Sequence, residues 1–192
     1  MPFGSYQISV EEALRNAVLL LKEAGVAAVK LEGGAQVAPL VAAMTGQGIP
    51  VMAHIGLLPQ TAALWHGYRV QGCDEASARE ILKAALALEQ AGAFSVVLEC
   101  VASEAAALIT EKLNIPTIGI GSGPHCDGQV LVFHDLVGLN EGHVPRFVKR
   151  YGAAAEVMRR AVGDFAAEVS QGLYPGDEHS FPMNADELKR LY

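Results

Sequence analysis

Apolar strand-like segments alternate with amphipathic helical segments along most of the chain, and this alternation constrains the fold more than any other feature of the sequence. The segments "IPVMAHIG", "FSVVLEC" and "IPTIGIG" are almost continuously apolar. Strands of this kind are typical of parallel sheets with both faces covered, and helical connections let consecutive strands run parallel. We therefore expect an α/β fold built on a parallel sheet.

The element boundaries follow from capping residues and glycines. Ser9 and Glu12 have the spacing of a capping box and Gly25 is suited to a C-cap, while Asp74 and Gly92 are expected to bound a second helix. Helices are expected over residues 9–25, 35–48, 74–92, 103–114 and about 144–172, with a short one in the polar tail. Strands are expected over residues 26–32, 49–56, 94–100 and 115–121. Without an internal repeat or low-complexity linker, residues 1–192 are expected to form a single domain.

Composition narrows the class of protein. The 192 residues carry a net charge of −7, which argues against binding to nucleic acid or to anionic membranes. A local basic cluster, "PRFVKRY", could hold an anionic group, but a solvated helix end is the commoner interpretation. Three widely spaced cysteines, no secretory signal and no apolar span of roughly 18 residues favour a cytoplasmic protein with reduced thiols.

Polar residues stand at the carboxyl ends of the expected strands, where parallel α/β folds place their active sites. Because side chains alternate across a strand, Lys30 and Glu32 should point to the same side. An ordinary ion pair is the alternative for this pair, and a hydrogen-bonded core histidine is the alternative for His54. Glu99 follows "FSVVL" and should be poorly solvated, so it is a candidate general base.

Two further motifs are interpreted as turns. "GIGSG" lacks the spacing of a dinucleotide fingerprint, so its glycines are better explained by a tight turn or by close approach of the backbone to a ligand. "HCDG" places a histidine, a cysteine and an aspartate together, but adjacent residues rarely converge on one metal, and a surface turn is favoured.

Several strings together resemble the ketopantoate hydroxymethyltransferase family: "MPFGSYQ", "KLEGG", "HIGLLPQ", "GAFSVVLEC", "IPTIGIGSGPHCDGQVLV" and "YPGDEHSF", in this order. The resemblance implies a (β/α)8 TIM barrel that uses Mg²⁺. It also implies transfer of a hydroxymethyl group from 5,10-methylenetetrahydrofolate to 3-methyl-2-oxobutanoate, which gives 2-dehydropantoate in pantothenate biosynthesis. Members of the family form homo-oligomers in the cytoplasm.

The same resemblance assigns roles to the four strand-end residues. Glu32 matches the family's metal-site glutamate, and Lys30 matches the lysine that binds the keto acid. His54 matches a substrate-contacting histidine, and Glu99 matches the general base that removes the C3 proton to form an enolate.

The chain departs from the family pattern at its beginning. Family members have further strands there, which supply two metal-binding aspartates and a serine that contacts the substrate. We therefore expect an N-terminally truncated, incomplete barrel with C-terminal helices, lacking the first β/α units. The alternatives are a non-catalytic fragment or subunit that packs with a full-length homologue, and another Mg²⁺-dependent barrel enzyme acting on 2-oxo acids.

Overall fold

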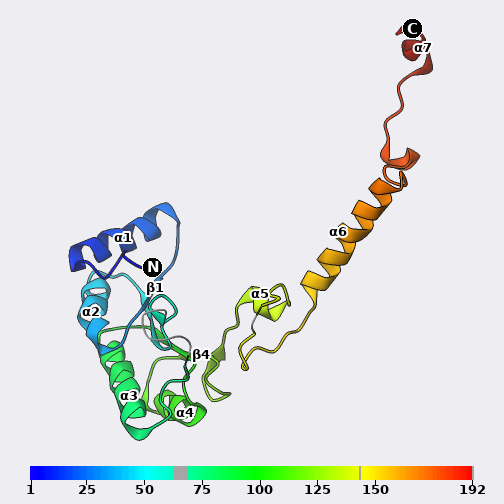
Figure 1. The fold of residues 1–192 in the computed structure, drawn as a ribbon. Coiled ribbons are helices and arrows are strands. Elements are labelled where there is room, and N and C mark those ends of the chain that lie inside the picture. Colours follow the sequence, from blue (N-terminus) through cyan, green and yellow to red (C-terminus); the bar gives the residue numbers. More distant parts are fainter. Residues whose placement is uncertain (63–68, 143, 192) are drawn as a thin grey trace. The chain divides into compact units, whose positions relative to one another are not determined.

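The computed structural model of the protein describes residues 1–62, 69–142 and 144–191. The chain divides into two compact units, Met1–Leu131 and Val132–Tyr192. Figure 1 follows the chain from the strands and helices of the first unit to the helices of the second. No helix among the described residues is long and apolar enough to span a membrane.

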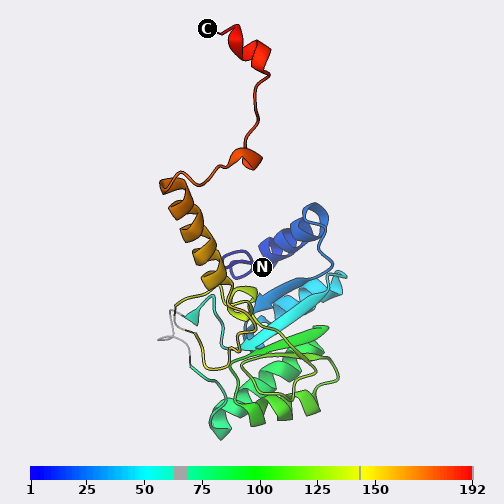
Figure 2. The same cartoon turned by 90° about the vertical axis from the view of Figure 1, so that its right-hand side faces the viewer.

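The first unit contains a parallel sheet of five strands in the order β1-β2-β3-β4-β5 (Figure 2). The strands are β1 (Val29–Glu32), β2 (Val51–Gly56), β3 (Ser95–Glu99), β4 (Thr117–Ile120) and β5 (Gly128–Gln129). The expectation of a parallel α/β sheet is confirmed. β5 was not expected, because its two residues lie in a stretch without apolar periodicity.

The helices of the first unit form a row beside the sheet in Figure 1. They are α1 (Val10–Glu23), α2 (Ala38–Gly46), α3 (Glu75–Gln90) and α4 (Ser103–Lys112), with a 3-10 turn, η1 (Ala35–Val37), before α2. The main apolar core contains side chains from one face of β1–β3 together with the apolar sides of all four helices. The helices therefore cover the same face of these strands.

Capping residues fix the starts of α1 and α3 as expected. Ser9 and Asp74 each accept a hydrogen bond from the backbone N–H three residues further on, at 3.1 and 2.9 Å, and each such cap contributes about 1 kcal/mol. Both helices end two residues before the predicted glycine, at Glu23 and Gln90. Gly25 and Gly92 come directly after the C-caps and have φ angles of +64° and +92°, a conformation that glycine adopts readily.

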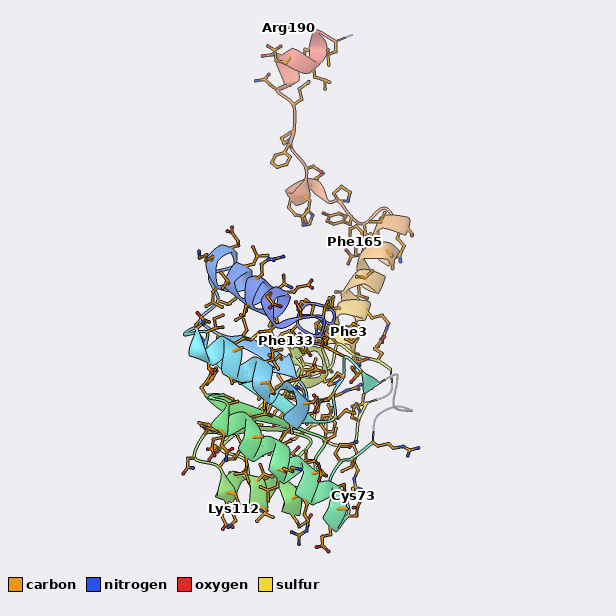
Figure 3. All side chains as sticks on the ribbon, turned by 90° about the vertical axis from the view of Figure 1, so that its left-hand side faces the viewer. Phe3, Cys73, Lys112, Phe133, Phe165 and Arg190 are labelled. Atoms are coloured by element: carbon orange, nitrogen blue, oxygen red, sulfur yellow. The ribbon has the colours of Figure 1, made fainter. Side chains whose placement is uncertain are left out.

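The cysteines of the described residues are free thiols, as expected for a protein without a disulfide framework. Cys73 is exposed just before α3 (Figure 3), Cys100 is buried directly after β3, and Cys126 is half-buried. Burial raises the pKa of the Cys100 thiol above its ordinary value, and the neighbouring Glu99 carboxylate raises it further.

The second unit consists of α5 (Phe133–Leu136), α6 (Ala154–Ser170), a 3-10 turn η3 (Asp177–His179) and α7 (Ala185–Lys189). The short helix expected in the tail is confirmed by α7. The start predicted for the long helix was wrong, because α6 begins ten residues after Val144. Pro145 and Gly152 both lie in the intervening segment, and glycine and proline are the residues least suited to a helix interior.

Candidate active site

The register of the sheet brings the predicted residues together at the carboxyl ends of three adjacent strands. Glu32 in β1 pairs with His54 in β2, and Gly56 in β2 pairs with Glu99 in β3. Residues that alternate with them along the strands belong to the core on the helix side: Val29, Leu31, Val51, Ala53, Ile55, Val96 and Leu98. The candidate side chains therefore extend from the opposite face of the sheet.

Lys30 and Glu32 lie on the same side of β1, as predicted. The Lys30 Nζ is 3.9 Å from Glu32 Oε1, and the lysine side chain is 43% exposed whereas that of the glutamate is only 7% exposed. An ion pair of this length with one solvated partner contributes little to stability. The contribution of this ion pair to stability is therefore too small to explain why Lys30 and Glu32 stand at the end of β1.

The Glu32 carboxylate has one fixed oxygen. The backbone N–H of Gln60, in the loop after β2, donates a hydrogen bond of 3.1 Å to Glu32 Oε2. A buried carboxylate needs such donors, because burial removes the water that would otherwise solvate its charge. The other oxygen, Oε1, faces the Lys30 ammonium.

His54 is buried and contacts the candidate base. Its Nε2 lies 2.8 Å from the Leu57 carbonyl oxygen and 3.2 Å from Glu99 Oε2. A carbonyl oxygen and a carboxylate both accept hydrogen bonds, so we assign a proton to Nε2. Nδ1 is buried and has no hydrogen-bond partner among the described residues. His54 therefore donates its Nε2–H to the Leu57 carbonyl oxygen, keeps Nε2 within 3.2 Å of Glu99 Oε2, and has no partner at Nδ1 among the described residues.

The turn after Glu99 is held in a conformation that most residues avoid. Cys100 has φ +50°, which is uncommon for a residue other than glycine, and such positions cluster at functional sites. The buried hydroxyl of Ser122 donates to the Leu98 carbonyl oxygen at 2.7 Å and accepts from the Val101 N–H at 3.1 Å. These two hydrogen bonds hold the backbone on both sides of Glu99 and Cys100, and so fix the position from which the Glu99 side chain extends.

The motifs predicted as turns have structural partners. In "GIGSG", Gly121 and Gly123 have φ angles of +66° and +78°, and a Cβ at Gly123 would lie 2.1 Å from Ser103 Oγ. In "HCDG", the Asp127 carboxylate accepts hydrogen bonds from the Thr117 N–H at 2.8 Å and from its hydroxyl at 3.1 Å. These contacts join the segments around β4 and account for the aspartate.

The described residues form no group of three or more histidine, cysteine, aspartate or glutamate side chains that could hold a metal ion. Glu32 is the carboxylate that sequence analysis assigned to a metal. One carboxylate fits Mg²⁺ as a single ligand, because Mg²⁺ in proteins often keeps several waters and takes further oxygens from its substrate.

A cavity of about 750 Å³ lies on one side of Glu32, between the residues before α1 and those around η1 and α2. Its walls include Tyr6, Val37 and Leu58, but not Lys30, His54 or Glu99. This cavity therefore adjoins the candidate site only at Glu32, and the candidate site itself consists of the contacting pairs Lys30–Glu32 and His54–Glu99.

Sequence reasoning did not single out Tyr6, Gln60 or Ser122. The first two belong to the strings "MPFGSYQ" and "HIGLLPQ", so the signal was present in motifs that carried the resemblance. Ser122 lies inside "GIGSG", a motif that was interpreted from its glycines alone.

Comparison with known proteins agrees with these motifs. The sequence model of the family described as ketopantoate hydroxymethyltransferase matches residues 1–177. The chain is 56% identical over 192 residues to the 3-methyl-2-oxobutanoate hydroxymethyltransferase of Heliobacterium modesticaldum, covering 100% of this chain and 69% of the relative. It is 51% identical over 191 residues to the enzyme of that name from Syntrophobacter fumaroxidans, covering 100% of this chain and 68% of the relative.

Among solved structures, a candidate phosphonomutase from Burkholderia cenocepacia J2315 matches 88% of this chain and 66% of its own chain. The TM-score is 0.50 at 15% sequence identity, a likeness that concerns the fold alone. The parallel sheet, the helices along it and this likeness agree with the TIM-barrel class, although the five described strands form an open sheet. On the family match and the identities to its members, the chain belongs to the ketopantoate hydroxymethyltransferase family.

Proposed function

We propose that the chain catalyses the transfer of a hydroxymethyl group from 5,10-methylenetetrahydrofolate to 3-methyl-2-oxobutanoate, giving 2-dehydropantoate for pantothenate synthesis. The observation that carries the proposal is the contact of Glu99 with His54 on the sheet face that also presents Lys30 and Glu32. Because the chain belongs to this family, we assign to the arrangement a base, a histidine beside the base, a cation and a metal-binding carboxylate.

Glu99 is the proposed general base. Its Oε2 lies 3.2 Å from His54 Nε2, and we assign to Oε1 the removal of the proton from C3 of the keto acid. The electron pair left on the substrate forms an enolate, whose C3 then bonds to the one-carbon unit of the folate. The two carbon–nitrogen bonds of that one-carbon unit break, water supplies the oxygen of the new hydroxyl group, and tetrahydrofolate leaves with the C3 proton and one proton from water on its two nitrogens. With a side chain 14% exposed, Glu99 is sheltered and still within reach of a ligand.

Lys30 and His54 are proposed to bind the keto acid. The half-exposed Lys30 ammonium would attract the substrate carboxylate and the negative charge that develops on the keto oxygen. Contact of His54 with the substrate would involve Nδ1, the ring nitrogen that has no partner among the described residues. Both side chains would thus orient the C3 proton toward Glu99.

Glu32 is proposed as one ligand of Mg²⁺, with its Oε2 steadied by the N–H of Gln60. When bound, the ion would stabilise negative charge on the keto oxygen. We expect weak binding by the chain itself, because a single carboxylate replaces only part of the water around Mg²⁺. A cytoplasmic homo-oligomer is also part of the proposal, as the family resemblance implies, and light scattering after size exclusion would test the assembly.

The test is exchange of the C3 proton of 3-methyl-2-oxobutanoate in D₂O, followed by NMR with Mg²⁺ and without folate. The wild-type chain should exchange this proton, and Glu99→Gln should abolish the exchange because an amide is not a base. Glu23→Gln is the matched control, since Glu23 is exposed at the end of α1. Equal exchange by wild type and Glu99→Gln would refute the assignment of the base.

The second candidate is a non-catalytic subunit that packs with a full-length homologue. The absence of a group of three metal-binding side chains among the described residues favours it. This role predicts no C3 exchange by the chain alone and co-purification with a full-length homologue. Exchange by the isolated chain that depends on Glu99 would exclude it.

A further inference from the structure

Tyr6 lies in the segment before α1, and its ring is buried in the main core with 4% of its surface exposed. Its hydroxyl donates a hydrogen bond of 3.0 Å to the Glu32 carbonyl oxygen and accepts one of 3.2 Å from the Glu32 N–H. One phenolic oxygen therefore satisfies both backbone groups of the candidate metal ligand.

These two backbone groups point away from the rest of the sheet. Gly33 donates its N–H to the His54 carbonyl oxygen of β2, and in a parallel strand the adjacent residue directs its N–H and C=O to the other side. β1 is the first strand in the sheet order, so among the described strands none lies on that other side. The Tyr6 hydroxyl occupies the place where a neighbouring strand would pair with Glu32.

The loop after β2 fixes the side chain of the same residue. Gln60 donates its backbone N–H to Glu32 Oε2, and its side-chain Oε1 is 3.4 Å from the Tyr6 hydroxyl. Its side-chain amide also donates to the Met1 carbonyl oxygen at 3.0 Å. Three sequence motifs thus meet at Glu32, one holding its backbone, one holding its carboxylate and one supplying the residue.

We propose that Tyr6 is a positioning residue for Glu32, whose hydroxyl fixes the end of β1 and so aims the carboxylate at the face shared with Lys30. The inference rests on the proposed function only for the metal role of Glu32. If Tyr6 only packed in the core, its ring would be sufficient and its hydroxyl would have no role. The two bonds to one backbone residue distinguish the positioning role from core packing.

The test uses Tyr6→Phe, which removes the hydroxyl and keeps the ring. Amide hydrogen exchange at Glu32 should become about five- to tenfold faster, the factor that corresponds to one net hydrogen bond. The Gly33 amide, which donates to β2, should exchange at an unchanged rate. Binding of Mn²⁺, measured by the EPR signal of the free ion, should weaken severalfold because the carboxylate loses its fixed direction.

Thr45→Val is the matched control for general destabilisation. The Thr45 hydroxyl donates to the Ala91 carbonyl oxygen at 2.7 Å and makes no contact with Glu32, so its removal costs a hydrogen bond away from the site. The control should not speed exchange at Glu32 relative to Gly33, and it should leave the Mn²⁺ affinity unchanged.

The outcomes separate this inference from the proposed function. An unchanged Glu32 exchange rate in Tyr6→Phe, or the same local change in Thr45→Val, would overturn the positioning role. Mn²⁺ binding that survives in Glu32→Gln, or no binding by the wild type, would refute the metal role of Glu32. In that case the exchange rates alone decide whether Tyr6 holds the end of β1.

Discussion

Replacing Gly56 with alanine should displace the candidate base without touching its side chain. Gly56 ends β2, pairs with Glu99 and has φ +91°. A Cβ added there would lie 2.3 Å from the Glu99 carbonyl oxygen and 2.7 Å from Val101 Cγ2. The same carbonyl oxygen accepts the N–H of Leu57 at 2.8 Å, so the contact that forms the turn would also be disturbed.

The sizes of the two effects follow from two free-energy costs and one displacement. A side chain at this φ costs about 1–3 kcal/mol, and weakening the Leu57–Glu99 hydrogen bond costs about 1 kcal/mol. The Glu99 carbonyl must also retreat from 2.3 Å to at least 3.0 Å, a movement of about 0.7 Å. We expect a total loss of about 2–4 kcal/mol in unfolding free energy and, from a misplacement of this order, a fall in exchange rate on the order of 100-fold.

Gly48→Ala is the control, since Gly48 has φ +78° but nothing within 4 Å of the added Cβ. It should lose only the conformational contribution and keep its exchange rate. Urea unfolding gives the first quantity and C3 proton exchange of 3-methyl-2-oxobutanoate in D₂O gives the second. Equal losses in Gly56→Ala and Gly48→Ala would refute the argument that the end of β2 holds Glu99 in place.

Three further predictions concern the turn after Glu99. Ser122→Ala should cost about 1–3 kcal/mol of unfolding free energy, because it leaves the buried Val101 N–H and Leu98 C=O without their partner. The control Ser170→Ala, at an exposed position of α6, should change the unfolding free energy by less than about 0.5 kcal/mol. Equal losses of the two variants on urea unfolding would contradict this prediction. Burial raises the pKa of the Cys100 thiol above 9.0 in the folded chain, so on raising the pH the thiol ionises in the unfolded chain before it ionises in the folded chain. The unfolding free energy should therefore fall as the pH rises past about 9. At pH 8, iodoacetamide should label the exposed Cys73 and spare Cys100, and equal labelling by mass spectrometry would disprove the assignment.

Local patterns in the sequence predicted much of the first unit. Asp74 was recognisable as an N-cap because capping is local: its carboxylate accepts a backbone N–H only three residues further on. The common direction of Lys30 and Glu32 followed from the two-residue period of a strand. Glu99 could be placed at a strand end because the apolar run before it stops there.

Features that depend on distant residues could not be predicted in this way. The Ser122 hydroxyl bonds to Leu98 and Val101, more than twenty residues earlier in the chain, and no periodicity signals such a contact. Tyr6 likewise serves Glu32, 26 residues further on. The late start of α6 was missed because apolar residues continue through the segment that holds Gly152.

The parallel sheet has a consequence for the order in which the site forms during folding. Helix α2 lies between Glu32 and His54 in the chain, and α3 lies between His54 and Glu99. Each of these contacts therefore closes a long loop, and the entropy lost in closing it precedes the energy gained from the contact. Contacts of such high sequence separation tend to slow folding, and those absent from the transition state influence unfolding instead. Weakening the contact between Tyr6 and Glu32 should therefore shorten the lifetime of the native chain more than it delays folding.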